Sequence, residues 1–169
     1  MATPGSMNVF DEMGIYWAEI ADKNQTERQI QLLKNSLKRD GYVLDLACGT
    51  GRHSVALSTE GYDMVGLDVS ANLLTIARQH SSSVQMVRGD MRFLPFKYQA
   101  FSAAVSMDTS FGYLPSDQDD AVSLAEARRV LRQDSVFVVD DKGALLHGGV
   151  DGVAYLSHSI EVLRVINNV

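Results

Sequence analysis

Short apolar runs alternate with amphipathic segments along most of this chain, and this alternation restricts the fold more than any other feature of the sequence. Five runs are expected to be strands, at 42–46, 64–68, 84–87, 101–107 and 135–141. Strands that lack polar alternation are buried on both faces, as in a parallel sheet whose crossover helices cover each side. We therefore predict an α/β fold with a doubly wound, mostly parallel sheet and helices on both faces.

Amphipathic helices are predicted before and between these strands. One covers 26–40 and is followed by Gly41, which suits a helix stop. Another begins after Ser70, a residue type that favours the cap position. A later helix is expected to be capped by Asp119 or Asp120, and its apolar residues recur at steps of three and four: Ala121, Leu124, Ala127 and Leu131.

The size of the chain indicates a single domain. Its 169 residues, 46% of them hydrophobic, suffice for one core and are too few for two ordinary ones. Residues 1–6 are small, polar and turn-prone, and we expect them to be an expression remnant outside the fold. We expect 7–41 to form an N-terminal helical cap, 42–141 the sheet core, and 142–169 an atypical short tail of the same domain.

Charge and cysteine usage restrict the partners and the compartment. The formal net charge is −6 and the 15 Lys and Arg residues are scattered, which disfavours tight binding to a phosphate backbone. No apolar run approaches the roughly 20 residues of a membrane span, and no basic segment followed by an apolar one opens the chain. The single cysteine, Cys48, fits a reducing compartment. We predict a cytoplasmic protein with neither a nucleic-acid nor a membrane partner.

Aspartates stand at the ends of four consecutive predicted strands. They are Asp45, Asp68, Asp90 and Asp108. In a doubly wound sheet, ligands lie outside the carboxyl ends of the strands, so residues at those ends carry most of the functional weight. Any one of these acids could be a turn or cap residue. Four in phase with the strands predict a ligand site along this edge.

The stretch DLACGTG, residues 45–51, joins the first strand to the next helix and is expected to be the floor of that site. Gly49 and Gly51 remove side chains where a ligand would lie on the backbone, and Ala47 is small for the same reason. Asp68 follows Gly51 by 17 residues. That spacing is close to the roughly 20 residues at which a dinucleotide fold places its ribose-binding acid.

Two nucleotide ligands fit this turn. The run from Gly49 to Ser54 resembles the G-x-G-x-x-G loop of NAD-binding folds, with serine in the third glycine position. However, Asp45 would repel a pyrophosphate but not an ammonium or sulfonium group. Asp90 is suited to accept a hydrogen bond from an adenine amine. These acids favour S-adenosylmethionine, and an NAD-binding oxidoreductase remains the less favoured alternative.

The motif "VLDLACGTGRHS" and those that follow it resemble the class I S-adenosylmethionine-dependent methyltransferases of the small-molecule type. The resemblance runs from about Val43 to Asp140 and includes "GDMRFLPF", "SMDTSFGYL" and "EARRVLRQDSVFVVD". It implies a Rossmann-like sheet and S-adenosylmethionine as the cofactor. By position, the family's cofactor-binding residues correspond to Asp45, Ala47, Gly49, Gly51, Asp68, Val69, Asp90, Met91 and Asp108, with Tyr16 on a segment that folds over the cofactor.

The resemblance also implies a role for several of these residues. The glycine turn underlies the methionine portion, Asp68 binds the ribose hydroxyls, and Val69 stacks near the adenine. Asp90 binds the adenine amine, and Met91 donates its backbone N–H. Tyr16 has a second interpretation, as an aromatic ring packed on the sheet edge.

The methyl acceptor is predicted by exclusion and by one motif. The chain lacks the Asn-Pro-Pro-aromatic and Pro-Cys motifs of methylases that act on nucleic-acid bases. "TSFGYL" looks like the corresponding stretch in enzymes that methylate amines of amino acids or amino sugars. We expect in-line displacement onto a small amine, with Asp108 and Tyr113 as candidates for taking its proton. The four histidines lack ligand spacing, so no metal site is predicted, and each is expected to be a surface or capping residue.

The tail separates the chain from the usual pattern of this family. Members normally continue past the fifth strand with a helix and an antiparallel strand pair, whereas only 28 residues follow Asp141. We expect the usual C-terminal strand pair to be lacking, and the fifth strand to need cover from the tail or from another chain. Three alternatives follow: an enzyme completed by a homodimer partner, a non-catalytic cofactor-binding or regulatory module, or a truncated chain.

Overall fold

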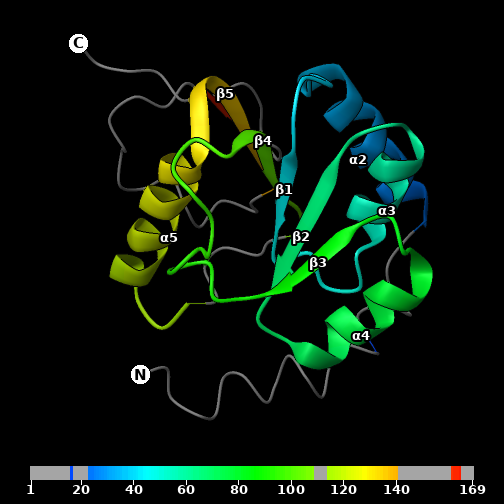
Figure 1. The fold of residues 1–169 in the computed structure, drawn as a ribbon, viewed down its shortest axis with the longest axis horizontal. Coiled ribbons are helices and arrows are strands. Elements are labelled where there is room, and N and C mark those ends of the chain that lie inside the picture. The colour runs from blue at the N-terminus through cyan, green and yellow to red at the C-terminus, as the bar shows by residue number, and fades with distance from the viewer. Residues whose placement is uncertain (1–15, 17–22, 109–113, 141–160, 165–169) are drawn as a thin grey trace.

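A computed structural model describes residues 16, 23–108, 114–140 and 161–164 of the chain (Figure 1). Its helices are α2 (Lys23–Ser36), α3 (Arg52–Thr59), α4 (Ala71–His80) and α5 (Asp117–Val130). Its strands are β1 (Val43–Leu46), β2 (Met64–Asp68), β3 (Gln85–Arg88), β4 (Phe101–Ser106), β5 (Leu131–Val139) and β6 (Glu161–Arg164). Helices and strands alternate from α2 to β5, apart from the β3–β4 connection, which is a loop.

The strands form one six-stranded sheet in the order β3-β2-β1-β4-β5-β6. The first five are parallel, and β6 pairs with β5 in the antiparallel sense. The chain builds outward from β1 through β2 to β3, and then resumes on the other side of β1 with β4. This reversal places the topological switch point at the carboxyl ends of β1 and β4, where doubly wound folds bind ligands.

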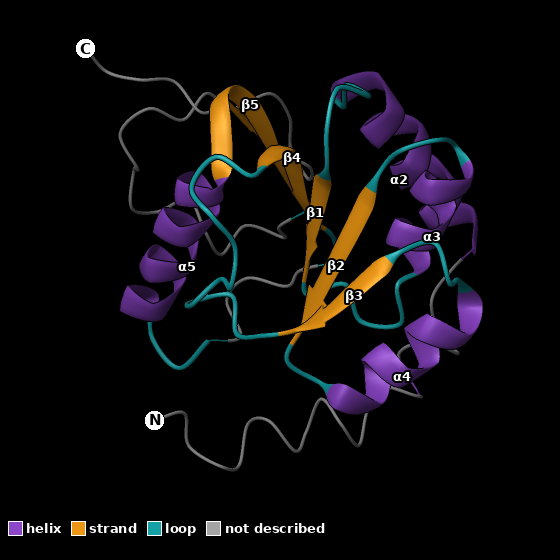
Figure 2. Ribbon diagram, viewed as in Figure 1, coloured by secondary structure: helices purple, strands orange, loops and turns teal. Residues whose placement is uncertain are grey.

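Helices cover both faces of the sheet, which confirms the predicted doubly wound arrangement. Figure 2 shows α2, α3 and α4 on one side and α5 on the other. Alternate residues of β1 point to the two sides: Val43 packs with Leu33 of α2 and Leu57 of α3, whereas Leu44 packs with Ala127 of α5. Burial on both faces is why these strands carry almost no polar alternation.

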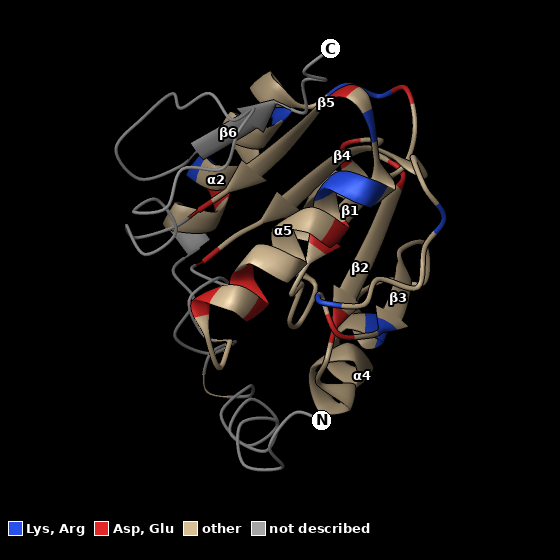
Figure 3. Cartoon of the chain, turned by 90° about the vertical axis from the view of Figure 1, so that its left-hand side faces the viewer, with Lys and Arg blue, Asp and Glu red and all other residues tan. Residues whose placement is uncertain are grey.

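The tail contributes one strand to the sheet. The backbone of 161–164 pairs with Val136–Val139, and Figure 3 shows β6 alongside β5. The sequence predicts that either the tail or another chain covers the fifth strand, and in the structure the tail covers it. Among the residues that the structure describes, β6 is the one strand after β5, so the usual pair is absent from that part of the chain.

Two predicted helix ends are wrong. The first helix covers Lys23–Ser36 rather than 26–40. The cap of α5 is Ser116, whose hydroxyl accepts the backbone N–H of Asp119 at 3.2 Å and donates to the Asp119 carboxylate at 2.8 Å. Ser116 and Asp119 form the S-x-x-acid capping pattern, which favours a cap three or four residues earlier than expected. Leu131, which we expected in this helix, begins β5.

Gly66 in the middle of β2 lies against two sulfur atoms, and we expect Gly66→Ala to destabilise the fold. A Cβ there would lie 2.8 Å from the Cys48 Sγ and 2.8 Å from the Met86 Sδ. Overpacking of this kind costs about 1–3 kcal/mol of unfolding free energy, measurable by chemical denaturation. Adding Cys48→Ala removes one of the two sulfur atoms and is expected to restore part of the loss. Equal losses in the single and double variants would contradict this explanation.

Candidate cofactor site at the carboxyl ends of the strands

The turn between β1 and α3 has the backbone conformation that its sequence predicts. Ala47, Gly49 and Gly51 have φ values of 56°, 55° and 75°, in the left-handed region that glycine adopts most readily. The Cys48 N–H donates to the Leu67 carbonyl of β2 at 3.0 Å, and the Gly51 N–H donates to the Cys48 carbonyl at 2.8 Å. The turn is therefore tied to β2 as well as closed on itself.

The two glycines of the turn have different surroundings. Among the residues that the structure describes, no atom would lie within 4 Å of a Cβ on Gly49, so these residues leave the space over Gly49 open. A Cβ on Gly51 would lie 2.8 Å from the Met86 Cε and 3.1 Å from the Ala77 Cβ. Gly49 therefore leaves room at the surface of the turn, whereas Gly51 allows close packing of the turn on α4 and β3.

The Asp68 carboxylate lies directly beside the turn. One oxygen accepts the Gly49 N–H at 2.8 Å, and the other accepts the Ser70 N–H at 2.9 Å. Only 6% of the residue is exposed. The structure thus brings the acid after β2 to the glycine turn after β1, as the sequence predicts. A buried carboxylate beside open space over a glycine is a fitting acceptor for ribose hydroxyls.

The Asp45 carboxyl is buried and bonded to one side chain that the sequence analysis missed. The Ser54 hydroxyl of α3 donates to it at 2.5 Å, and Asp45 is 2% exposed. Burial raises the pKa of Asp45 to about 7, against a smaller opposing effect of the Ser54 bond. Ser54 occupies the third glycine position of the loop. Its hydrogen bond to Asp45 explains why a serine stands there instead of a glycine.

Asp90 is already paired with a cation. Arg92 donates from Nη2 and Nε to its carboxylate at 2.6 Å and 3.0 Å, and also reaches Asp119 of α5 at 2.8 Å. Burial acts in the opposite direction, but these bonds hold the pKa of Asp90 below its usual value. The role of Asp90 at an adenine amine remains a prediction. In that role the Asp90 carboxylate would accept hydrogen bonds from both the adenine amine and Arg92. Val69 and Met91 next to these acids are partly buried.

A second polar cluster follows β4 and β5. Asp108 has φ 59° and forms an ion pair with Arg52, the first residue of α3. The Gln29 side-chain amide of α2 donates to Asp108 at 2.9 Å and to Asp140, just after β5, at 2.7 Å. The Gln29 amide oxygen lies 2.9 Å from the His53 Nε2. Neither Gln29 nor Asp140 was predicted, because only the fold brings α2 to these strand ends.

His53 is buried, so the expectation that it is a surface or capping residue is wrong. It is 5% exposed, and burial lowers the pKa of His53 to about 3, so the imidazole is neutral. The first turn of α3 faces α2, and this turns the ring inward. His80 is exposed, as expected, while His147 and His158 lie outside the described residues. In the part of the chain that the structure describes, no group of three or more acid, His or Cys side chains could hold a metal ion.

The remaining predicted site residues are less informative. Tyr16 is 66% exposed, which is inconsistent with packing on the sheet edge, and its role over the cofactor stays a prediction. Tyr113 lies outside the described residues.

Cys48 is buried, and burial raises the pKa of its thiol, as expected of a packing residue. Across the ranges described, no helix combines the length and apolar character of a membrane span.

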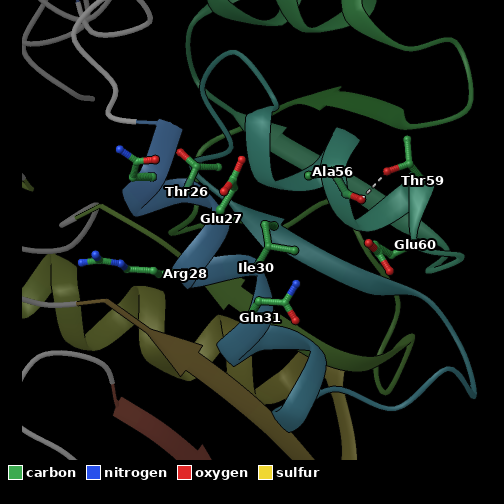
Figure 4. Close-up of a pocket in the computed structure, with 9 residues that line it drawn as sticks. Thr26, Glu27, Arg28, Ile30, Gln31, Ala56, Thr59 and Glu60 are labelled. Carbon is green, nitrogen blue, oxygen red and sulfur yellow. Dashed lines mark hydrogen bonds between the residues drawn. The ribbon is translucent and has the colours of Figure 1, made fainter.

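A groove of about 680 Å³ lies on another part of the surface, between α2 and α3 (Figure 4). It contains none of the predicted site residues, and its lining comes from Asn24, Thr26, Glu27, Arg28, Ile30, Gln31, Ala56, Thr59 and Glu60.

Known proteins resemble both the sequence and the fold. A family model described as a methyltransferase domain matches residues 43–134. A glycine/sarcosine N-methyltransferase of Parasynechococcus marenigrum is 34% identical over 145 residues, covering 79% of this chain and 51% of that protein. A dTDP-3-amino-3,4,6-trideoxy-alpha-D-glucopyranose N,N-dimethyltransferase of Streptomyces venezuelae is 34% identical over 109 residues, covering 64% and 46%.

The crystal structure of Streptomyces venezuelae DesVI superimposes with a TM-score of 0.63 at 29% identity, covering 79% of this chain and 57% of that one. The chain spans about half the length of the curated relatives it matches. The open Gly49 surface and the buried Asp68 acceptor fit S-adenosylmethionine, the cofactor of such enzymes. Because the methyltransferase-domain model covers more than half of its residues, the chain belongs to the class I S-adenosylmethionine-dependent methyltransferases.

Proposed function

We propose that the protein transfers a methyl group from S-adenosylmethionine to a small-molecule amine. The observation that supports S-adenosylmethionine as the methyl donor is the Asp68 carboxylate, which accepts the Gly49 N–H at 2.8 Å. The acceptor half is supported by relatives whose names specify amine methylation, of glycine or sarcosine and of an amino sugar. The anionic Asp108 after β4 also suits an amine, which arrives in water as an ammonium ion.

The cofactor, when bound, supplies a methyl group that positively charged sulfur has already activated. The chain then has mainly to orient the acceptor and exclude water, and a strong catalytic base is not required. Asp108 is the described candidate for taking the proton that the amine loses. Arg52 and Gln29 hold this carboxylate in place, and its side chain is 32% exposed, within reach of a ligand. Tyr113 is the second candidate, and turnover unchanged in Tyr113→Phe would remove it.

The assembly and the compartment are also proposals. We propose a homodimer that completes the acceptor pocket, although β6 already pairs with β5 and that edge needs no partner. A mass measurement in solution would decide between monomer and dimer. The buried free thiol of Cys48 is compatible with a reducing compartment, and we place the protein in the cytoplasm.

Methyl transfer is tested by measuring S-adenosylhomocysteine release with glycine, sarcosine and glucosamine. We expect an amine-dependent rate that rises with pH, because only the neutral amine attacks. Glycolate and glucose are matched controls that replace the amine with a hydroxyl group, and they should give no more than the background rate. Cofactor binding without transfer to any of these amines would instead favour the non-catalytic binding module.

A further inference from the structure

Arg92 joins the end of β3 to the start of α5 through two carboxylates. Its Nε and Nη2 donate to Asp90 at 3.0 Å and 2.6 Å, and its Nη1 donates to Asp119 at 2.8 Å. The Arg92 backbone N–H also donates to Asp90, at 2.9 Å. Asp119 in turn accepts the hydroxyl of Ser116, the cap of α5, at 2.8 Å. The Asp90 carboxylate is therefore held by way of a helix residue that lies 27 positions after Arg92.

The two members of this ion pair differ in their exposure. The Arg92 side chain is 13% exposed, whereas that of Asp90 is 30% exposed. Partial burial raises the pKa of Asp90, but the bonds from Arg92 outweigh it and hold the pKa below its usual value, so the carboxyl is ionised at neutral pH. A carboxylate can accept about four hydrogen bonds, and Arg92 supplies three N–H groups. Asp90 can therefore accept one more, from a ligand.

The position of Asp90 along the sheet edge matches that of a nucleobase. The backbone N–H of Gly89 donates to the carbonyl of Asp68 at 2.9 Å, so the residue before Asp90 is bonded to the proposed ribose-binding acid. The sheet order β3-β2-β1 places Asp90, Asp68 and the glycine turn in succession along the carboxyl edge. In S-adenosylmethionine the ribose lies between the base and the methionine portion. With the methionine portion on the glycine turn, the base extends toward Asp90.

A second arginine attaches the same loop to the same helix without contacting Asp90. The loop between β3 and β4 passes along α5 (Figure 1), where Arg129 donates to the carbonyls of Leu94 and Phe96 at 3.0 Å and 2.9 Å. Arg129 also forms an ion pair with Glu126, at 2.6 Å. Arg129 can thus attach the loop to α5 by itself, which separates that task from the bonds that Arg92 makes to Asp90.

We propose that Arg92 is a positioning residue that fixes the Asp90 carboxylate as an acceptor for the 6-amino group of adenine, and so contributes to base specificity. A guanidinium is a rigid fork that bonds to a carboxylate at two points and restricts its orientation. The bond of the same guanidinium to Asp119 fixes the fork itself. The proposal rests on the cofactor half of the proposed function and on the predicted role of Asp90, and not on the methyl acceptor.

The test measures how much the 6-amino group contributes to binding. S-adenosylhomocysteine and its analogue with hydrogen in place of that amino group are titrated calorimetrically against each variant. The unaltered chain is expected to bind the amino compound about tenfold or more tightly, because the analogue lacks a hydrogen bond to a charged group. Arg92→Met should lower this ratio about threefold or more, because a carboxylate that is free to rotate must be ordered by the ligand.

Three further variants separate the causes. Arg92→Lys keeps the positive charge but offers a single ammonium in place of the fork, and it should lower the ratio as well. Asp90→Ala removes the acceptor and should bring the ratio to about one. Arg129→Met is the matched control, because it loosens the same loop from α5 but leaves the bonds between Arg92 and Asp90 in place. It should leave the ratio unchanged.

Equal weakening of both compounds in Arg92→Met, or an equal fall of the ratio in Arg129→Met, would indicate a purely structural role and overturn the proposal. If Arg92→Met fails to fold in a thermal melt, Arg92→Lys decides, and an unchanged ratio there overturns the proposal too. An unchanged ratio in Asp90→Ala would overturn the role of Asp90 and this proposal together.

The same titrations distinguish failure of this proposal from failure of the proposed function. Binding of neither compound by the unaltered chain would overturn the donor site and the role of Arg92 with it. Absence of amine methylation by a chain that binds S-adenosylhomocysteine with the expected ratio would contradict only the proposed acceptor.

Discussion

Asp68→Ala is expected to lower the affinity for S-adenosylmethionine by about 100-fold or more. The Asp68 carboxylate accepts the N–H groups of Gly49 and Ser70, and it is the buried acceptor beside the open surface of the turn. Each hydrogen bond to a charged group contributes roughly 1.5–3 kcal/mol, and the substitution removes those that position the turn and those that the ribose would make. Two such bonds account for the expected loss.

Calorimetric titration with S-adenosylmethionine, S-adenosylhomocysteine and NAD in parallel measures this effect. Asp63→Ala is the matched control, because this aspartate is exposed at the other end of β2. It should bind both S-adenosyl compounds like the unaltered chain. Full affinity in Asp68→Ala would disprove the assignment of the ribose-binding acid, and preferential binding of NAD would favour the oxidoreductase alternative.

Asp45→Asn is expected to stabilise the protein relative to the unaltered chain as the pH rises from about 4 to 7. Burial raises the pKa of Asp45 to about 7 from an ordinary value of 3.8. The folded state therefore binds more protons than the unfolded state in this range, and the contribution of Asp45 to stability falls as the pH rises. A shift of about 3 units corresponds to roughly 4 kcal/mol at most, reached above pH 7.

His53 acts on stability in the opposite direction. Burial lowers the pKa of His53 to about 3 from 6.5, so the unfolded state binds the extra proton and stability falls as the pH drops below 6.5. Between pH 4 and 6.5 the Asp45 and His53 contributions oppose each other. Without the opposing contribution of Asp45, the pH dependence caused by His53 should dominate. The unfolding free energy of Asp45→Asn should therefore rise with pH across this range.

Chemical denaturation at a series of pH values, with the unaltered chain measured in parallel, tests this prediction. Asp63→Asn changes the net charge equally at an exposed position and should show no such pH-dependent difference. A constant difference between Asp45→Asn and the unaltered protein from pH 4 to 8 would mean that Asp45 is ionised throughout, despite its burial.

Much of the fold follows from the sequence because local patterns reflect burial. The runs that become β1 and β2 are continuous since both of their faces are covered, and the carboxyl ends of parallel strands must meet at one edge. That is why the sequence predicts Asp68 beside the glycine turn. The helix ends are predicted less accurately. Ser116 and the neighbouring aspartates are all residue types that favour the cap position, and only the hydrogen bonds between Ser116 and Asp119 identify Ser116 as the cap.

The doubly wound sheet, the cofactor turn and the acid beside it are predictable from the sequence alone, because each depends on residues close together in a strand–turn–helix unit. Which side chains those groups contact depends on long-range packing. Arg92 on Asp90, Ser54 on Asp45, and Gln29 between Asp108 and Asp140 all depend on how helices and strand ends pack. The partners of Gln29 lie 24 to 111 residues away in the chain, and only the packing of α2 on the sheet brings these polar groups within hydrogen-bonding distance.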